Sequence, residues 1–387
     1  MALNTVSSDR LSTNVKNTNF TAAEKQDLTD DIKPLLGSSG GGRKNLIING
    51  AMNVAQRGTS STSSGYHTVD RFQGAHTGTD EAPTQAQVDV ASGTTPYTLG
   101  FRKAFKITNG NQTGGAGSGD TIQIVYKIEA QDLTSSGWNY TSSSSYVTLS
   151  FWVKSSVAQE FHGFLLSSDS PRQLYSFSTG SLSADTWTKV TKTIPGNSNI
   201  SITHGNGEGL NLRITQFAGT DKTGTITQNQ WAAFNSSVRY PNYTSTWYTT
   251  NDATFELTGV QLEVGSVATD FEHRSFAVEK KLCERYFKVF SSFSGIAAAS
   301  GVFQGPLQFD MRATPSASLS PSGKARITDS AFADFDISSG ASLNEYNATP
   351  TAMRLHVSGF SGLSTQKPMT WLATGTNQSD VHLAAEL

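Results

Sequence analysis

The sequence predicts a mainly β protein whose central part is an antiparallel β-sandwich. Hydrophobic residues make up 36% of the 387 residues and charged residues only 16%, so Ser, Thr, Asn and Gly fill much of the chain. Ser and Thr suit exposed strand faces, and Gly and Asn suit turns. Several stretches alternate apolar and polar residues between such turn-forming clusters, which is typical of half-buried strands. Aromatic residues, at 10%, supply the apolar surface that disordered chains lack.

Residues 1–44 differ from the rest and predict an N-terminal helix followed by a Gly-rich tether. Thr21 and Glu24 have the spacing of a capping box, and a short helix over residues 22–32 follows. A helix this short must dock on something to be stable in water. It either packs on its own domain or serves as an anchor into a larger assembly or as a self-association segment. The flexible tether at 37–42 favours the anchor.

Residues 45–274 show the sandwich pattern most clearly. In residues 121–129 the apolar positions Ile122, Ile124, Tyr126 and Ile128 alternate with polar ones. Residues 146–154 alternate in the same way, and Leu212 and Ile214 continue the pattern. Period-two alternation places one side of each strand in a core. We therefore expect two packed antiparallel sheets.

The alternation changes phase within residues 255–264. Phe255 and Leu257 are apolar at odd positions, but the next apolar residue is Val260. A β-bulge that absorbs one residue at Gly259 would keep both halves of the strand facing the core. Three polar residues would then share a solvated outer face. They are Glu256, Gln261 and Glu263.

A connector helix is expected over residues 275–290. Ser275 can cap its N-terminus, and Glu279 lies in the first turn, where an acidic side chain stabilises the helix dipole. An apolar stripe at helical spacing would pack it down. The stripe consists of Leu282, Cys283, Tyr286, Phe287 and Phe290. Cys283 lies on this stripe, so it is interpreted as a core residue and not as a reactive thiol.

Residues 291–387 return to short apolar–polar alternations. Strands are expected at 301–309, at 351–357 and at 368–373. These residues predict a smaller C-terminal β domain.

Charge and terminal sequence exclude several kinds of partner. The net charge is −2 with both signs interspersed, so the sequence predicts no nucleic-acid partner. No apolar run has the length of a membrane span, so membrane insertion is not expected. The first residues lack the layout of a signal peptide, and the single Cys283 excludes an internal disulfide. We therefore expect synthesis in a cytoplasm.

Two stretches resemble known phage proteins. Residues 45–58, which begin Asn-Leu-Ile-Ile-Asn-Gly, together with residues 66–72 resemble the opening of a module that is widespread in phage tail fibres and other virion proteins. Residues 255–276, with Leu-Cys-Glu-Arg-Tyr-Phe at 282–287, resemble its closing segment. Between them, residues 149–155 and 185–190 look like strands of the jelly rolls found in carbohydrate-binding modules.

The resemblance implies a jelly roll whose first and last strands meet, a location in the virion and a homotrimer. The N-terminal segment is similar to the fibre openings of short-tailed phages of marine cyanobacteria. One departure is that residues 51–55 replace the acidic residue and Trp that relatives often carry after Asn-Gly. Any contribution of those side chains to a relative's site is therefore not expected here.

These features together predict a virion structural protein, a tail fibre that binds a host-surface glycan without catalysis. Its expected partners are other virion proteins through the N-terminal segment, further copies of itself, and a glycan or protein of the host surface. A capsid-decorating or head-fibre protein is one alternative. A polysaccharide depolymerase is the second.

A sugar-binding site needs exposed aromatic rings beside amide and hydroxyl groups, because sugars present apolar C–H faces. Residues 231–248 read as a long loop, and binding residues concentrate in such loops. The candidate glycan contacts are Trp231, Tyr240, Tyr243, Trp247 and Tyr248, with Trp138 and Tyr140 as a smaller copy of the pattern. The alternative is that these rings pack between subunits or fix the loop to the sandwich.

Cofactors and catalytic groups have little support in the sequence. The seven His residues are scattered, which argues against zinc. Asp70, Asp270 and Glu272 could supply oxygen ligands to a structural calcium ion, although no ligand loop of fixed spacing is visible. The only candidates for a glycosidase carboxylate pair are Glu256 and Glu263, and a solvated outer face explains both more simply. No cofactor and no enzymatic activity are therefore expected.

Overall fold

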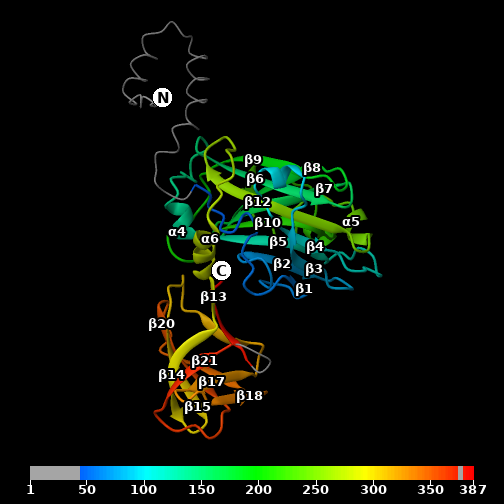
Figure 1. Cartoon of the computed structure of the whole chain (residues 1–387). Helices are drawn as coiled ribbons and strands as arrows, with labels where there is room; N and C mark the ends of the chain where they lie inside the picture. Colours follow the sequence, from blue (N-terminus) through cyan, green and yellow to red (C-terminus); the bar gives the residue numbers. More distant parts are fainter. Residues whose placement is uncertain (1–43, 374–377) are drawn as a thin grey trace, which may run out of the picture. The chain divides into compact units, whose positions relative to one another are not determined.

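The computed structural model describes residues 44–373 and 378–387. It is mainly β with few helices, as the sequence predicts, and its sheets are antiparallel (Figure 1). One compact unit covers Asn45–Leu387. The predicted helix at 22–32 and the tether at 37–42 lie outside the described residues. In the part that is described, no helix has both the length and the apolar character needed to cross a membrane.

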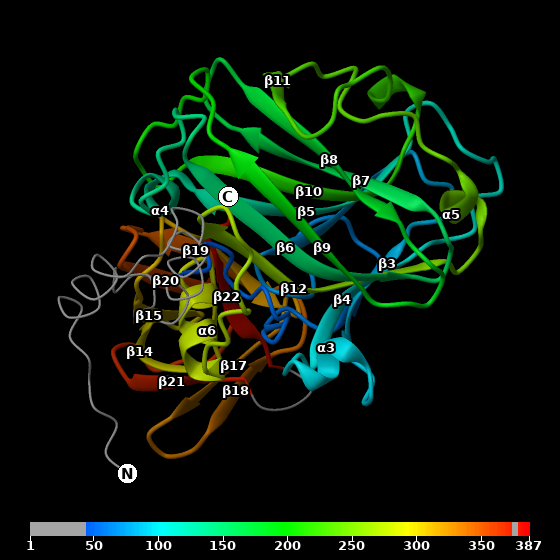
Figure 2. The same cartoon turned by 90° about the horizontal axis from the view of Figure 1, so that it is seen from above.

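Two six-stranded sheets form the sandwich (Figure 2). Sheet A has the order β1 (Ser60–Ser61), β3 (Thr84–Asp89), β4 (Lys103–Thr108), β12 (Thr254–Val264), β6 (Tyr146–Ser155) and β9 (Thr188–Pro195). Sheet B has the order β11 (Trp231–Ala233), β8 (Gln173–Ser181), β7 (Glu160–Ser167), β10 (Glu208–Ala218), β5 (Thr121–Glu129) and β2 (Phe72–Thr77). The short helices α3 (Thr95–Thr98), α4 (Ala130–Thr134) and α5 (Thr246–Thr249) and the 3-10 turn Thr220–Lys222 lie in the connections.

The core between these sheets is built from the alternating residues that the sequence indicates. Ile122, Ile124, Tyr126 and Ile128 of β5 are all buried in it. Facing them from β6 are Val147, Leu149, Phe151 and Val153. Each such side chain stabilises the fold by about 1.5–3 kcal/mol when it leaves water. The strand predictions at 121–129 and 146–154 are confirmed.

The predicted β-bulge in β12 is confirmed. The register between β12 and β6 shifts between Thr258 and Gln261, and Gly259 has a φ of 63°. Phe255, Leu257 and Val260 consequently all enter the same core. A Cβ atom at Gly259 would lie 2.7 Å from the ring of Phe101, so only glycine fits this position.

The predicted solvated outer face of β12 is wrong for two of its three residues. Gln261 is fully buried, and Glu263 is 3% exposed. The chain after β12 folds back over this face, so Thr269 donates from its main-chain N to Glu263 Oε1 at 2.9 Å. Glu272 likewise donates from its main-chain N to Gln261 Oε1 at 2.9 Å. Alternation within one strand cannot reveal a later segment that covers it.

The connector helix is shorter than predicted. Helix α6 spans Phe276–Glu284, and the Ser275 side chain caps it by accepting from the main-chain N of Val278. Phe287–Phe290 form strand β13 instead, which pairs with β22 (Asp380–Ala384). The helical prediction to residue 290 is therefore wrong at its end, because this long-range pairing competes with local helical spacing. Cys283 is buried beside Ile48, and burial raises the pKa of its thiol, which confirms its place in a core.

The remaining strands form two sheets with a core of their own. Sheet C has the order β13, β22 and β16 (Ser316–Ser320). Sheet D has the order β18 (Asp334–Ile337), β17 (Ala325–Asp329), β21 (Pro368–Leu372), β14 (Ser292–Ala299), β15 (Val302–Gln308), β20 (Ala352–Ser358) and β19 (Ser342–Tyr346). Trp371 is fully buried in this second core, with its ring stacked 5.6 Å from that of Phe293. The three strands expected after residue 300 are present.

The chain after β22 makes ionic contacts with the opening of the sandwich. Glu386 accepts from Arg57 Nη2 at 3.1 Å and pairs also with Arg71, whose side chain is 1% exposed. The guanidinium of Arg71 lies 3.4 Å from the ring centroid of Tyr286. Lys127 Nζ donates to the main-chain O of Leu387 at 2.8 Å. These contacts fix residues 386 and 387 to the fold.

Candidate functional site

The outer face of sheet B is partly covered by residues 219–245, the cover segment, which follows β10. The side chain of Tyr240, in the cover segment, is fully buried among Phe164, Leu166 and Leu174, which lie on this face of β7 and β8. The hydroxyl of Tyr240 lies 2.8 Å from Thr215 Oγ1 on β10. Burial of the Tyr240 side chain raises its pKa to about 12. The cover segment therefore has a packed, fixed position on the sheet.

The cover segment is also bonded to itself. The main-chain N of Arg239 donates to Lys222 O at 2.9 Å, and Gly224 N donates to Tyr240 O at 3.0 Å. A parallel β-bridge joins Thr223 and Tyr240. Two cationic side chains that lie far apart in the sequence, Lys222 and Arg239, are thereby held next to each other on the sheet.

A hollow of about 210 Å³ lies between the cover segment and strands β2, β5 and β10, and we call it the β5 hollow. It is lined by Ala75, His76, Thr77, Gly119, Thr121, Gln123, Arg213, Lys222 and Arg239. The side chain of Gln123 is 4% exposed, and its Oε1 accepts from Arg213 Nη1 at 2.9 Å. Because Gln123 and Arg213 stand on adjacent strands, the sheet fixes the direction in which the guanidinium points.

A second hollow of about 270 Å³ lies by β7, and we call it the β7 hollow. Its lining consists of Ala158, Gln159, Glu160, His162, Asn242, Thr244 and Thr246. Burial lowers the pKa of His162, and the charge of Glu160 opposes this effect. His162 Nδ1 lies 3.0 Å from Gln228 Nε2 of the cover segment. A neutral imidazole with one amide partner fits this position.

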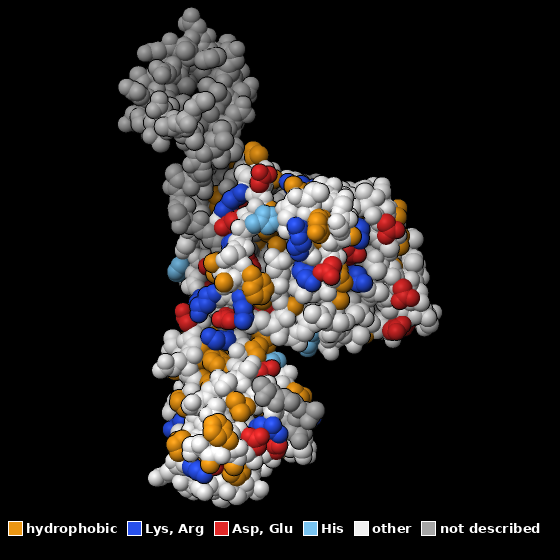
Figure 3. Space-filling model, in the orientation of Figure 1, with side chains coloured by type: hydrophobic (Ala, Val, Ile, Leu, Met, Phe, Trp, Pro, Cys, Tyr) orange, Lys and Arg blue, Asp and Glu red, His pale blue; other side chains and the backbone are white. Residues whose placement is uncertain are grey.

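Cations predominate in the β5 hollow. Its lining holds Arg213, Lys222 and Arg239 and no Asp or Glu. The guanidinium carbon of Arg239 lies 5.5 Å from the ring centroid of Phe234, and that of Arg172 lies 4.6 Å from the same centroid. On the face of the molecule that Figure 3 shows, by contrast, Lys and Arg are interspersed with Asp and Glu. The hollow is therefore a local concentration of positive charge on a chain with a net charge of −2.

The candidate glycan contacts in the cover segment do not form an exposed aromatic platform. Tyr240 is buried, and the hydroxyl of Tyr243 lies 3.0 Å from Thr215 O and accepts from His162 N at 3.2 Å. Trp231 is partly buried at the edge of sheet B, where its Nε1 donates to Pro195 O at 2.7 Å. These rings fix the cover segment to the sandwich, as the alternative interpretation holds.

Trp247 and Tyr248 lie in α5, and both are buried in the sandwich core. Trp247 Nε1 donates to Thr254 O at 3.1 Å. Tyr248 donates to Asp120 Oδ2 at 2.8 Å, and its ring stacks on Phe217 at 4.2 Å. Neither ring is exposed, as a ring that stacks on a sugar must be.

The smaller pair, Trp138 and Tyr140, is not brought near Trp247 and Tyr248 of α5. It follows α4, and Figures 1 and 2 place α4 and α5 at opposite ends of the sandwich. Trp138 is 3% exposed and donates to Ser145 O at 3.3 Å. Tyr140 packs edge-to-face on Trp138 with ring centroids 6.2 Å apart.

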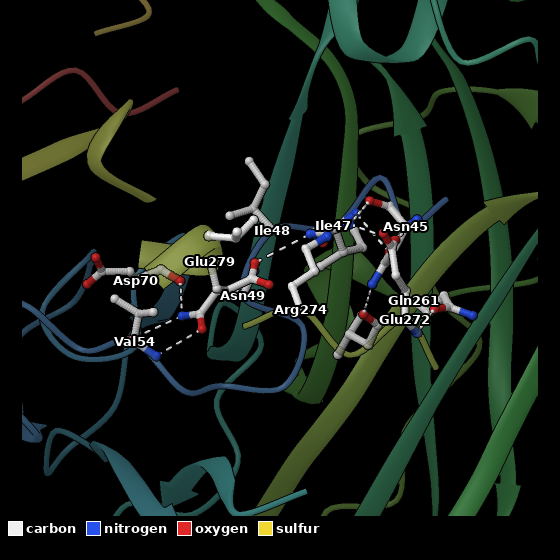
Figure 4. Close-up of polar contacts among 12 residues, drawn as sticks. Asn45, Ile47, Ile48, Asn49, Val54, Asp70, Gln261, Glu272, Arg274 and Glu279 are labelled. Carbon is white, nitrogen blue, oxygen red and sulfur yellow. Dashed lines mark hydrogen bonds and ion pairs between the residues drawn. The ribbon is translucent and has the colours of Figure 1, made fainter. Parts of the chain in front are cut away.

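The opening segment and the closing segment are joined by a buried polar network, which we call the clasp (Figure 4). Asn45 donates from Nδ2 to Val260 O at 3.1 Å and accepts at Oδ1 from Leu262 N at 3.0 Å. Arg274 Nη2 donates to Asn45 O at 2.6 Å and to Glu272 Oε2 at 2.9 Å. The opening segment and strand β12 therefore meet, whereas the first strand, β1, pairs with β3 and not, as the resemblance implies, with the last strand of the sandwich.

The Asn-Gly pair of the opening motif has a structural explanation in the clasp. Asn49 has a φ of 61°, a region that Asn tolerates better than most residues. Its Nδ2 donates to Val54 O and to Asp70 O, both at 2.9 Å, and its main-chain N donates to Glu279. A Cβ atom at Gly50 would lie 2.1 Å from Val260 O. The motif residues therefore close the fold and are not exposed to a ligand.

The carboxylates considered for calcium or catalysis mostly have partners within the protein. Asp70 is 1% exposed and accepts from Gln56 N at 2.9 Å, and burial raises its pKa against the effect of these hydrogen bonds. Glu272 pairs with Arg274, and Glu256 pairs with Lys154 Nζ at 3.0 Å. Among the described residues no three His, Cys, Asp or Glu side chains lie together as metal ligands would. Asp70, Asp270 and Glu272 are therefore not gathered into one site.

Sequence reasoning missed Gln123, Arg213 and Lys222 as site residues. The alternation of β10 does place Arg213 on the face opposite Leu212 and Ile214. It does not show which outer-face residues remain uncovered. Lys222 and Arg239 meet only through main-chain hydrogen bonds within an irregular segment, for which the sequence carries no pattern.

Comparisons with known proteins find similar structures but no related sequence. No protein-family model matches the chain, and no curated protein matches it. The enzymatically active domain of tailspike protein 4 from bacteriophage CBA120 is 12% identical over 57% of this chain and 21% of its own, with a TM-score of 0.30.

Two carbohydrate-binding modules are also similar. The N-terminal cellulose-binding domain of a Cellulomonas fimi β-1,4-glucanase is 12% identical over 56% of this chain and 99% of its own, with a TM-score of 0.26. The family 11 carbohydrate-binding module of Clostridium thermocellum is 11% identical over 55% of this chain and 98% of its own, with a TM-score of 0.25. The chain thus spans about a fifth of the tailspike domain and nearly the whole of each binding module.

Proposed function

We propose that this chain is a non-catalytic structural protein of a phage particle that binds a host-surface glycan at the β5 hollow. The observation that carries the proposal is the hollow itself, which is lined by Gln123 and Arg213 of sheet B together with Lys222 and Arg239 of the cover segment. Sugar hydroxyl, acetamido and acidic oxygens accept hydrogen bonds from such side chains. A site whose donors are already held in place loses less conformational entropy on binding.

The proposal that the chain is not catalytic rests on the two candidate carboxylates, which both have partners within the protein. Glu256 is paired with Lys154, and Glu263 accepts from Gln261 Nε2 at 2.9 Å and from Thr269 Oγ1 at 2.6 Å. A retaining or inverting glycosidase needs two carboxyl groups that flank one sugar. Neither of these groups lines the β5 hollow.

The virion location in this proposal rests on the opening and closing motifs and on the clasp. Residues of the two stretches that resemble the virion module bond to one another in the structure, since Asn45 contacts both Glu272 and Arg274. The proposal assigns attachment to other virion proteins to residues 1–44. In a homotrimer, three weak sites on one fibre would bind a repetitive glycan surface with much higher avidity than a single site.

A glycan array and a reducing-sugar assay test the proposal together. The purified chain is expected to bind host-type polysaccharides and to release no reducing ends from them. Immunogold labelling of virions is expected to mark the tail fibres. Retention of no glycan would contradict the binding function, and release of reducing sugar would contradict the absence of catalysis. Label on the head lattice would show that the chain is a capsid-decorating protein and not a tail fibre.

A further inference from the structure

We infer that the glycan bound in the β5 hollow is anionic and presents carboxylate, sulfate or phosphate oxygens to Arg213, Lys222 and Arg239. This inference rests on the proposed function and adds the chemical class of the ligand. It follows from three cations that share one hollow and lack a counter-charge.

The three cations have no acidic partner. No carboxylate of residues 44–373 or 378–387 lies within salt-bridge distance of Arg213, Lys222 or Arg239. Among the other described arginines some are paired with carboxylates, whereas Arg102 and Arg312 donate to main-chain oxygens and Arg172 and Arg354 lie against aromatic rings. The paired ones include Arg57, Arg71, Arg274, Arg285 and Arg326.

The two acidic side chains nearest to the hollow in sequence are directed to other groups. Asp120 precedes the lining residue Thr121, and its Oδ2 accepts from Tyr248 and from Gly117 N. Asp221 precedes Lys222, and its Oδ2 accepts from Ser118 Oγ at 3.3 Å. Neither carboxylate forms an ion pair with a cation of the hollow, and the nearer one, Asp221, has its Oδ2 3.7 Å from the position of a Cβ atom at the lining residue Gly119.

The surroundings of Arg239 disfavour its charge in the free protein. Burial lowers the pKa of Arg239, the charges of Arg213 and Arg172 lower it further, and Tyr240 acts in the opposite direction. A cation whose charge is disfavoured by burial and by neighbouring cations gains more from an incoming anion than an isolated surface cation does. An oxyanion in the hollow would relieve this repulsion.

The donors that remain free suit an oxyanion in number. Arg213 uses Nη1 for Gln123 and Nε for Asn211, and its Nη2 has no partner among the residues described. Arg239 uses Nε for Ser236 O, so both of its terminal nitrogens remain available. Two guanidinium ends and one ammonium group can together donate several charge-assisted hydrogen bonds to one acidic group.

Matched pairs of polysaccharides test the inference directly by isothermal titration calorimetry. Oligogalacturonate is compared with its methyl ester, which keeps the sugar ring and removes the charge. Dextran sulfate is compared with dextran, and polyphosphate tests phosphate oxygens without a sugar. The charged member of at least one sugar pair is expected to bind at least tenfold more tightly than its neutral partner, because a charge-assisted hydrogen bond contributes about that much.

Variants locate this binding at the hollow. Lys222→Gln and Arg239→Gln are each expected to weaken binding of the charged sugar about tenfold, and Arg239→Lys is expected to retain most of it. The matched control is Lys189→Gln, which removes an exposed cation from β9 of the other sheet. Circular dichroism checks that each variant remains folded.

Two results would overturn the inference. One is equal affinity for the charged and neutral members of both sugar pairs, and the other is full affinity of Lys222→Gln and Arg239→Gln for the charged sugar. Binding of neutral glycans alone would leave the proposed function in place and remove only the anionic class. Binding of polyphosphate without binding of any sugar would contradict both the proposed glycan-binding function and the anionic class of the glycan. A glycan array with no retained member would remove the proposed function itself.

Discussion

Arg274 donates from Nη2 to the main-chain oxygen of Asn45 at 2.6 Å, and 229 positions of sequence separate the two residues. Arg274 also contacts Glu272 at 2.9 Å and Glu279 at 3.4 Å, so one guanidinium joins the opening segment, the covering stretch after β12 and helix α6. The clasp closes the sandwich, because the segments that it connects lie at opposite ends of the module in sequence. The first two predictions concern its stability.

Gly50→Ala should destabilise the protein by about 3 kcal/mol or more, because the new methyl group would lie 2.1 Å from Val260 O and main-chain atoms must move. Urea unfolding of the purified chain measures this change. Gly205→Ala is the control, since a Cβ atom there meets no atom within 4 Å. Equal midpoints for the two variants would show that the opening segment is not packed on β12 as described.

Arg274→Met should lower the free energy of unfolding by about 3 kcal/mol, because it leaves the partly buried carboxylates of Glu272 and Glu279 without their cation. Chemical denaturation gives the value. Arg326→Met removes a more exposed arginine that also bridges two carboxylates, and its cost is expected to be below about 1 kcal/mol. A smaller loss for Arg274 than for Arg326 would contradict the central place of the clasp.

Trp247→Ala should destabilise the protein by about 3–5 kcal/mol, because this ring is fully buried in the sandwich core. Differential scanning calorimetry can follow the loss. Phe332→Ala removes an aromatic ring that is 89% exposed and should change stability little. If Trp247→Ala left stability intact and abolished glycan binding, the ring would be a ligand contact and not a core residue.

Acidification should destabilise the protein through His162. Burial lowers the pKa of this imidazole below its ordinary value of 6.5, so the unfolded chain binds the proton more readily than the folded one. The free energy of unfolding should therefore be at its full value above pH 6.5 and fall as the pH drops through 6.5 towards the folded pKa. His356 and His382, whose pKa values burial also lowers, should contribute in the same sense.

His162→Gln should make this decline shallower, because the variant has no proton to take up at that position. Urea unfolding at a series of pH values measures the slope. His204→Gln removes an exposed imidazole and is the control. An unchanged slope in His162→Gln would show that the imidazole is not held in its neutral form.

Much of the fold could be predicted because it depends on local alternation. The strand at Thr121–Glu129, the bulge at Gly259 and the cap at Ser275 all follow from residues a few positions apart. The end of α6 could not be predicted, since Phe287–Phe290 pair with residues nearly a hundred positions later in the chain. Burial of Gln261 and Glu263 was missed because Thr269 and Glu272, which lie outside the strand, fold back over them.

The sequence by itself determined which residues face inward, because the two-residue period of a strand is a local property of the backbone. It also placed a concentration of aromatic residues in the segment after β10. Only the tertiary structure decided that Tyr240 and Trp247 point into cores, and that Gln123, Arg213, Lys222 and Arg239 line one hollow. The physical reason is that a site on a sheet face depends on which neighbouring segments leave that face uncovered. The path of such a segment is fixed by hydrogen bonds between residues that are not neighbours in sequence, such as the bond from Arg239 N to Lys222 O.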